Sequence, residues 1–546
     1  MTNLFSKLNI TIVFVAIGVV YFIGMFVDVM DIDAAQYASL AREMLDSSGF
    51  LQVKLRNVDY LDKPPLSFWL ASLSFWAFGY SNLAYKLPSV LFSILAIYST
   101  FRFAKIYYSK EIAILSAVIL ATTQAFFLIN NDCRTDTVLI GCIAFASWHL
   151  AGYLKCKNWP NFIFAFVGIS FAMLSKGPLG LMVPVLGFGF DLLLKKDFKN
   201  IFQWQWLVGL VVIAIFLAPM CLGLYQQYGI KGLQFYFWDQ SFGRITGSNS
   251  TWKNDPDPFF LLHSFAWSFL PWPLLFFTAV FFKLKTLWIQ KFKVIDNQEF
   301  ITISAIVFSY LILSRSQYQL PHYIYSIFPF SSILTAAFVF KLVELGQKWV
   351  RSFYLLQMIV CIILLAVVAV LSFWPFQFNA LQVCIFASMG ILFIYLIFQK
   401  EINQLHKIIL LSTFTAIGVN LLMNSHVYPS LLKYQPSHEI ADYLRSKNVD
   451  ERHFFIFNDF YSHSLDFYTQ SVNQEVVDLA FFETLKEGEV YYCYTNSKGL
   501  EILTTNQIKY TLVGTYLEYP VTRVSLPFLN PSTRAERLVE KYLISL

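Results

Sequence analysis

The sequence contains little charge. Asp, Glu, Lys and Arg make up only 14% of its 546 residues, whereas hydrophobic residues make up 57%, with 57 Phe among them. Soluble globular domains carry about 25% charged residues. The composition therefore excludes an ordinary soluble enzyme and is typical of a polytopic α-helical membrane protein.

Cysteine and the common cofactor motifs are also scarce. The seven cysteines are an odd number and lie mostly within apolar runs, so they do not indicate a disulfide framework. No Cys and His residues have zinc-site spacing, no glycine-rich loop follows a strand, and no nucleophile elbow is present. The net charge of +6 comes mostly from basic loops between apolar runs, so it does not indicate a nucleic-acid partner.

Thirteen apolar runs are long enough to cross a membrane as helices. They cover 9–28, 84–106, 112–130, 136–154, 159–175, 178–194, 204–225, 258–282, 300–314, 318–340, 351–373, 378–398 and 407–424. No small-residue cleavage site follows the first run, so we expect it to be retained as a membrane anchor.

The basic residues predict the topology. If a further apolar run at 64–79 does not cross the membrane, the clusters of Lys and Arg between the spans all fall on one side. Short loops rich in Lys and Arg stay in the cytoplasm. We therefore expect the N-terminus inside, and the loop 29–83 and the C-terminus outside. The run 64–79 is then a juxtamembrane or re-entrant helix.

The opening loop, 29–83, is unusually charged for a chain of this composition. Its charged residues include Asp31, Asp33, Arg42, Glu43, Asp46, Lys54, Arg56, Asp59, Asp62 and Lys63. Apolar residues recur at helical spacing along 34–46, which predicts an amphipathic helix lying on the membrane surface. Asp33 precedes this helix at a capping position, where its carboxylate can be held in one direction.

The spans themselves hold few ionisable residues, chiefly His149, Asp191 and His263. An ion-coupled transporter usually carries paired charges at mid-membrane, so this pattern disfavours that class. Polar residues gather instead in the loops predicted outside, at 132–136, 175–178, 226–257 and 314–323. We therefore expect the chemistry of this protein at the outer surface.

The composition changes near residue 430, which predicts a small soluble α/β domain over 429–546, after a membrane domain over 1–428. The expected elements are a helix opening at Ser437, strands at 453–458, 489–494 and 508–524, and a last helix over 532–545. We expect this domain to serve as structural support or to dock the acceptor. The polar run 458–463 is explained as well by a turn after a strand as by a site.

An ordered set of short motifs resembles the ArnT branch of the GT-C glycosyltransferases, which groups with the bacterial relatives of protein O-mannosyltransferases. The motifs lie at 33–44 (DAAQYASLAREM), 62–69 (DKPPLSFW), 78–79 (FG), 87–89 (LPS), 134–136 (RTD), 175–177 (SKG), 243–244 (GR), 269–272 (FLPW) and 320–323 (LPHY). They cover most of the membrane region in the expected order. The thirteen spans and the outward C-terminal domain, which were derived separately, also match this branch.

The resemblance implies an inverting glycosyltransferase. It would move a sugar from a polyprenyl-phosphate donor to an envelope acceptor, such as a lipid A phosphate, on the periplasmic face of the bacterial inner membrane. A protein O-glycosyltransferase of the mannosyltransferase type, a lipid-linked sugar transporter or flippase, and a non-catalytic envelope scaffold stay open as alternatives. The implied partners are the lipid-linked donor, a lipid or protein acceptor and the membrane, with the chain as a monomer. No cofactor is certain, and a divalent cation is an open possibility.

The same resemblance assigns residue roles. The leading acid of the family falls on Asp33, the expected catalytic carboxylate, and its second acid falls on Asp136. The lysine that meets the donor phosphate falls on Lys63, and Arg244 and Lys176 are expected to assist it. The expected substrate-binding residues are Tyr37, Asp62, Arg134, His322 and Tyr323.

The sequence departs from the family pattern at three positions, where Ala34 replaces Glu, Gln36 replaces Arg, and Asp62 replaces Glu. Six of the assigned residues also have a structural alternative. These alternatives are helix caps for Asp33 and Asp136, interfacial anchors for Lys63 and Lys176, a satisfied interfacial histidine for His322 and a solvated loop charge for Arg244.

Cysteine labelling tests the predicted topology. In a cysteine-free background, a membrane-impermeant maleimide added from outside should label Ser81→Cys and leave Asn200→Cys unlabelled, because only that arrangement keeps the Lys clusters in the cytoplasm. Labelling of Asn200→Cys without labelling of Ser81→Cys would overturn the thirteen-span topology.

Overall fold

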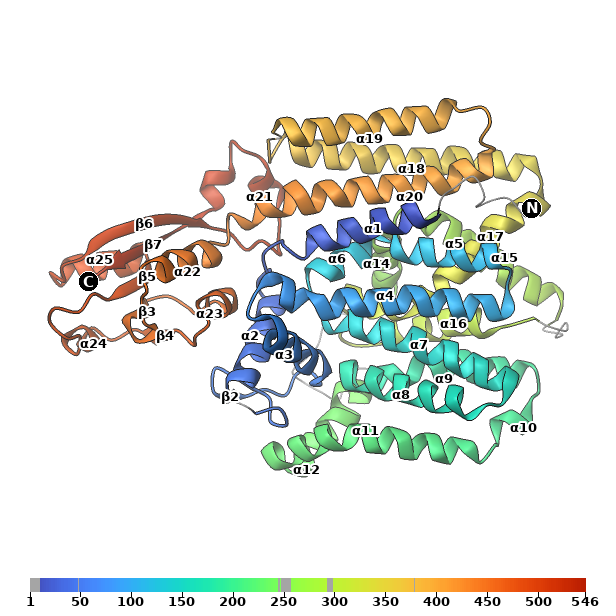
Figure 1. The fold of residues 1–546 in the computed structure, drawn as a ribbon, viewed down its shortest axis with the longest axis horizontal. Coiled ribbons are helices and arrows are strands. Elements are labelled where there is room, and N and C mark those ends of the chain that lie inside the picture. The colour runs from blue at the N-terminus through green and yellow to red at the C-terminus, as the bar shows by residue number, and fades with distance from the viewer. Residues whose placement is uncertain (1–9, 48, 244–245, 247–256, 292–297, 378) are drawn as a thin grey trace.

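The computed structural model describes residues 10–47, 49–243, 246, 257–291, 298–377 and 379–546. Long, roughly parallel helices form a bundle, and a small α/β domain lies beyond one end of it (Figure 1). Within the described ranges, eight helices are long and apolar enough to cross a membrane, or nine if a pair bent by 48° is one span. Each of the thirteen expected runs coincides with a helix or with two consecutive helices. The number of complete crossings stays a prediction.

The bundle helices are α1 (Ile10–Gly24), α4 (Asn82–Tyr107), α5 (Lys110–Ala121), α6 (Gln124–Asn131), α7 (Thr135–Cys156), α8 (Trp159–Lys176), α9 (Leu179–Leu194), α11 (Gln205–Tyr228), α14 (Phe260–Ser268), α15 (Pro273–Ile289), α16 (Ile301–Leu313), α17 (Phe328–Leu345), α18 (Gln347–Phe373), α19 (Ala380–Phe398) and α20 (Gln404–Leu422). Short helices connect them, namely α10 (Phe198–Ile201), α12 (Ile230–Gln234), η1 (Phe235–Gly243), η2 (Pro321–Ile327), η3 (Met423–Val427) and α21 (Tyr428–Leu432). Helices α5 and α6 are the bent pair.

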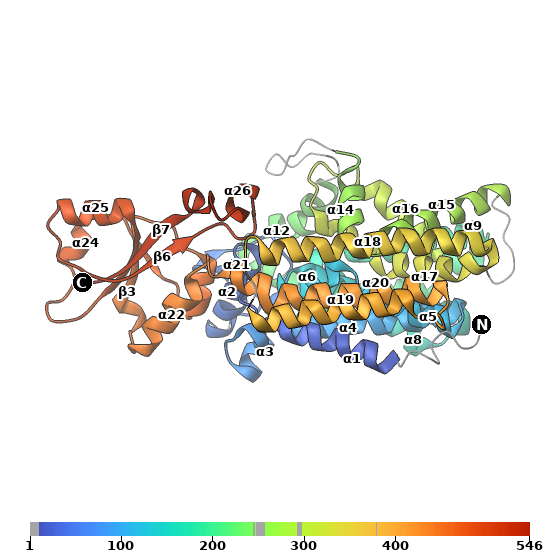
Figure 2. The same cartoon turned by 90° about the horizontal axis from the view of Figure 1, so that it is seen from above.

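The opening loop forms a compact unit at the end of the bundle that faces the α/β domain (Figures 1 and 2). It contains α2 (Asp33–Asp46), a hairpin of β1 (Lys54–Leu55) and β2 (Val58–Asp59), and α3 (Leu66–Phe78). The amphipathic helix expected over 34–46 is confirmed, and its apolar side packs on α3, where Phe68 is fully buried and the Ser72 Oγ donates to the Ala41 carbonyl at 2.6 Å. The position of α3 beside α2 supports a helix that does not cross.

The C-terminal domain is built on a five-stranded sheet. Its strands are β3 (Phe454–Phe457), β4 (Gln474–Val476), β5 (Tyr492–Asn496), β6 (Thr511–Glu518) and β7 (Val539–Ser545), in the spatial order β4-β3-β5-β7-β6. Strand β3 pairs in parallel with both of its neighbours, whereas β7 pairs antiparallel with β5 and β6. The helices are α22 (Ser437–Ser446), α23 (His463–Thr469), α24 (Ala480–Glu483), α25 (Ser497–Thr505) and α26 (Leu526–Leu529), with short turns at η4 (Glu451–His453) and η5 (Arg534–Arg537).

The last helix expected over 532–545 is wrong, because this segment is η5 followed by the inner strand β7. Leu543 belongs to the hydrophobic cluster on one face of the sheet and Ile544 to the cluster on the other, and both are fully buried. A strand covered on both faces does not alternate apolar and polar residues. Its sequence pattern therefore resembles the spacing of a helix.

Polar contacts join the domain to the bundle where α1 ends. The Gln435 side chain bonds both the Val29 carbonyl and the Asp31 amide, at 2.8 and 2.9 Å. His438 Nδ1 lies 2.8 Å from the Asp28 carboxylate. This hydrogen bond raises the pKa of His438 against the opposing effect of burial, and the charge of Asp442 raises it further. Protonated His438 therefore strengthens the junction.

The His438 contact predicts a pH dependence. A histidine with a raised folded pKa contributes stability that is fully present below its unfolded pKa of about 6.5 and is lost as the pH rises through the folded value. His438→Gln should therefore lower the thermal unfolding midpoint most near pH 6 and progressively less toward pH 9. Because the pair is partly exposed, we expect an effect of at most about 1 kcal/mol. A wild-type advantage that is equal at every pH would contradict this role.

Candidate active site

Polar side chains from five separate segments gather at the bundle end beneath α2. Asp33 opens α2, Asp136 lies in the first turn of α7, and Lys176 ends α8. His322 and Tyr323 belong to η2, and Lys63 precedes α3. Each residue is at or near a helix terminus, and these termini meet at the same end of the bundle.

The Asp33 carboxylate pairs with Arg134 and does not cap α2. Arg134 Nη1 lies 2.7 Å from Asp33 Oδ2, and Arg134 Nε lies 2.8 Å from Asp132 Oδ2. Burial alone would lower the pKa of Arg134, but Asp132 and Asp33 outweigh it and raise the pKa. The N-cap position is Ile32, and the Asp33 side chain is 43% exposed. The helix-cap alternative is therefore wrong, and the carboxylate is held in place while accessible.

Asp136 and Lys176 form a buried ion pair in the site. Lys176 Nζ lies 2.5 Å from one carboxylate oxygen of Asp136, and His322 Nε2 lies 3.9 Å from the other. The Tyr323 ring lies under the same ammonium, with 4.6 Å from Nζ to the ring centroid. The Asp136 and Lys176 side chains are only 3% and 10% exposed. Asp136 is thus not a simple helix cap, and Lys176 is not an interfacial anchor.

Lys63 lies at an apolar cavity between the opening loop and α11. Its ammonium is 2.5 Å from Asp62 Oδ2, and the Gln240 side chain donates to the Asp62 carbonyl. The Lys63 side chain is 16% exposed, which does not fit a lysine that reaches into solvent. The cavity is small and open to solvent, and it is lined by Tyr60, Leu61, Pro64, Met220, Leu224 and Tyr236 among others.

The three cations lie close enough together to act on one another. Lys63 and Arg134 both exert their charge on Lys176 and on His322. Burial raises the pKa of the Tyr37 phenol, and Tyr60, Asp33 and Asp62 add to this effect. The structure therefore brings together nine of the ten residues expected from the sequence. Arg244, the tenth, lies outside the described residues.

Three contributors were missed by sequence reasoning. Asp132 holds Arg134 at Nε, whereas Asp33 holds it at Nη1, and Tyr60 lies beside Tyr37. Tyr85 donates to the Ala34 carbonyl at 2.7 Å and thereby ties the first turn of α2 to α4. Asp132 and Tyr60 each lie within two residues of an expected site residue, which was the available signal. Tyr85 has no such signal, because only packing brings it to α2.

A metal site has no support in the part of the chain that the structure describes. No group of three or more His, Cys, Asp or Glu residues there could hold a metal ion. Asp33 and Asp136 each pair with a cation instead. The divalent cation considered from the sequence stays untested.

The chain is similar to several known proteins. Residues 62–222 match the family described as dolichyl-phosphate-mannose-protein mannosyltransferase. An uncharacterized protein of Aquifex aeolicus is 26% identical over 80% of this chain and 81% of its own length. The undecaprenyl phosphate-alpha-4-amino-4-deoxy-L-arabinose arabinosyl transferases of Wigglesworthia glossinidia brevipalpis and Erwinia tasmaniensis are each 24% identical, over 61% and 63% of this chain and 59% and 61% of theirs.

Solved structures extend the likeness to almost the whole chain. ArnT from Cupriavidus metallidurans bound to undecaprenyl phosphate superposes with a TM-score of 0.75 at 16% identity, covering 98% of this chain and 97% of that one. Its apo state gives a TM-score of 0.72 at 15% identity, with the same coverage. The chain has the fold of ArnT. The GT-C fold expected from the motifs is confirmed, and the ArnT-like chain is a multi-pass membrane protein with a small C-terminal domain.

The sequence match is shorter than the structural one. The ArnT-like chain aligns with only about six tenths of the length of the curated arabinosyl transferases. The fold is therefore shared over the full chain, whereas the sequence likeness is not.

Because the Asp136–Lys176 pair is buried, removing one partner should strongly lower the stability of the protein. Lys176→Met leaves the Asp136 carboxylate buried without its partner, which typically costs about 3–5 kcal/mol. We expect a large fall in the thermal unfolding midpoint, partly restored in the double variant Asp136→Asn/Lys176→Met. The matched control is Lys486→Met, which removes an exposed pair with Glu489 and should change stability by less than about 1 kcal/mol. Equal effects of the two lysine variants would show that the Asp136 pair is not buried as described.

Proposed function

We propose that this chain transfers a sugar from a polyprenyl-phosphate donor to an envelope acceptor at the outer face of the bacterial inner membrane. One observation carries the proposal. The partly exposed Asp33 carboxylate and the cations of Lys63, Arg134 and Lys176 converge at one end of the bundle, beside an apolar cavity. The fold shared with ArnT bound to undecaprenyl phosphate and the names of the curated transferases support it.

The cations suit a phosphate leaving group. In an inverting transfer, an acceptor oxygen attacks the anomeric carbon while the bond from that carbon to the donor phosphate oxygen breaks. The phosphate keeps the electron pair and its negative charge, so fixed cations beside it stabilise the transition state. Lysine offers a compact charge and arginine a bidentate fork. Lys63, Lys176 and Arg244 are proposed as phosphate ligands, with the lipid chain in the cavity behind Lys63.

The role of Asp33 depends on the acceptor. If the acceptor is a hydroxyl group, the carboxylate accepts its proton as a general base. If the acceptor is a lipid A phosphate, it is already anionic, and Asp33 then orients it or stabilises positive charge on the sugar ring. Tyr37, Asp62, Arg134, His322 and Tyr323 are proposed to position the two substrates.

A protein acceptor is the second candidate, because the matched family over 62–222 is described by protein mannosyl transfer. Mass spectrometry of lipid A and of glycoproteins from a deletion strain separates the two acceptors. A flippase is disfavoured, because the charges described here gather at one end of the bundle. Transport of the donor without turnover by the purified protein would favour the flippase.

The central test is Asp33→Asn. The substitution is nearly isosteric, so the protein should stay folded, but loss of acid–base assistance typically costs about 10²–10⁴ in rate. We expect kcat to fall by that factor in transfer of radiolabelled sugar from an undecaprenyl-phosphate donor.

The matched control for this test is Asp46→Asn at the other end of α2, where the carboxylate pairs with Arg42 and accepts from Tyr80. It should keep nearly full activity. Near-normal turnover in Asp33→Asn would move the chemistry away from this residue.

A further inference from the structure

The C-terminal domain binds the segment just before Asp33. The Asp31 carboxylate accepts hydrogen bonds from the Ser464 amide at 3.1 Å, from the Ser464 hydroxyl at 2.8 Å and from the Ser462 hydroxyl at 2.7 Å. These three donors belong to the first turn of α23 and the residue before it. A residue two positions from the proposed catalytic carboxylate is therefore fixed by the other domain.

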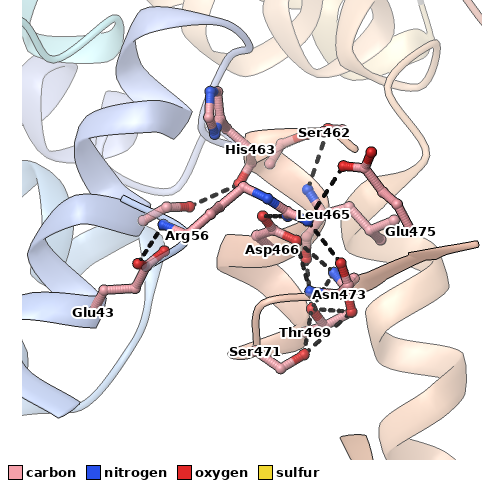
Figure 3. A network of polar contacts seen from close by, with 12 residues as sticks. Glu43, Arg56, Ser462, His463, Leu465, Asp466, Thr469, Ser471, Asn473 and Glu475 are labelled. Atoms are coloured by element: carbon pink, nitrogen blue, oxygen red, sulfur yellow. Dashed lines mark hydrogen bonds and ion pairs between the residues drawn. The ribbon is translucent and has the colours of Figure 1, made fainter. Parts of the chain in front are cut away.

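A second contact crosses the domain boundary at the hairpin of the opening loop (Figure 3). The Arg56 guanidinium pairs with the fully buried Asp466 of α23 and donates to the Asn473 carbonyl at 2.8 Å. It also lies 4.1 Å from the centroid of the Tyr461 ring. Asp466 is itself held by the amide and side chain of Asn473, at 3.1 and 2.8 Å. The pair is thus desolvated and fixed on both sides.

The hairpin that carries Arg56 also bonds to α2. The Arg56 backbone amide donates to the Glu43 carboxylate at 2.7 Å, near the end of the helix. Along the helix, the Ser39 hydroxyl donates to the His463 carbonyl at 2.9 Å, and Arg42 donates to the Gln470 carbonyl at 2.9 Å. Segment 462–473 of the C-terminal domain therefore contacts α2 from Gln36 in its first turn to Arg42.

Helix α2 needs such support to stay in one place. It has 14 residues, and an isolated helix of that length is marginal in water, so tertiary contacts must hold it. Its apolar side rests on α3 and α4, in the same hydrophobic cluster as Phe467 of α23. Further support comes from hydrogen bonds of α3 and α4 to the Ala41 and Ala34 carbonyls, and from the polar contacts with the C-terminal domain.

We propose that Asp466 and Ser464 of the C-terminal domain are positioning residues for the transfer reaction. They act through Arg56 and Asp31, respectively. Arg56 holds α2 near its end, at Glu43, and Asp31 holds the residues just before its first turn, so that the Asp33 carboxylate stays against Arg134. The proposal rests on the proposed function, because it gives the domain a role in the same reaction. This role differs from that of a domain that only stabilises the fold and from that of a domain that only docks the acceptor.

The test compares Arg56→Gln, Arg56→Lys, Asp466→Asn and Ser464→Ala in the purified full-length protein. A displacement of about 1 Å at a reacting group can cost about 10²-fold in rate. We expect kcat to fall by about 10- to 10²-fold in Arg56→Gln and Asp466→Asn, with partial rescue in Arg56→Lys. The donor KM should change by less than about threefold, since these residues are not among the proposed donor ligands. Hydrogen–deuterium exchange in peptides covering 31–46 should rise in parallel.

The matched control is Arg534→Gln, at a domain contact that involves no residue of α2. Arg534 donates to the Tyr434 hydroxyl at 3.0 Å and to the Pro375 carbonyl at 2.7 Å. Its loss should lower the thermal unfolding midpoint but leave kcat and exchange in α2 unchanged. Ser464→Ala keeps the backbone bond to Asp31, so it stays folded and tests the contact if Asp466→Asn does not fold.

Two results would overturn the proposal. The first is wild-type kcat and exchange in the folded Arg56 and Ser464 variants. The second is a raised acceptor KM at unchanged kcat, which would assign the contact to acceptor docking. The exchange measurement needs no substrate, so it separates the two hypotheses. If the wild type transfers no sugar, the proposed function fails, whereas unchanged exchange in α2 defeats the positioning role whatever the activity.

Discussion

Buried charges must be paired, and this constraint organises the structure at the end of the bundle. The Asp136–Lys176 pair joins the first turn of α7 to the last turn of α8 in a buried setting. Burying either group alone would be strongly unfavourable, so the two helix ends must meet. Arg134 with Asp33 and Asp132, and Lys63 with Asp62, repeat the arrangement nearer the surface. The site is thus preorganised as cations that already have partners.

This pairing has a consequence for the proposed chemistry. A donor phosphate that enters the site meets cations whose directions are set by carboxylates, so little reorganisation is needed when negative charge develops. The same carboxylates keep the cations from being unpaired when the donor is absent. The site therefore combines a stable resting state with cations whose directions are already fixed.

The described residues also show how three parts of the chain share the work. The bundle contributes Asp136 and Lys176 to the site, and the opening loop contributes Asp33 and Lys63. The C-terminal domain adds no side chain to this set, but it bonds to the helix that carries Asp33 along its length. Helix α2 is therefore held by the C-terminal domain as well as by α3 and α4 of the membrane domain.

Composition and local spacing were enough to predict the membrane class, the positions of the hydrophobic helices, α2 and the ordered motifs. Sequence reasoning was wrong about β7, since a strand covered on both faces loses its alternation. It placed Asp33 at a cap, whereas the carboxylate turns to Arg134. Only the tertiary structure decided the ion-pair partners and the contact of Arg56 with Asp466, because 410 residues separate that pair and no local pattern encodes a contact across two domains.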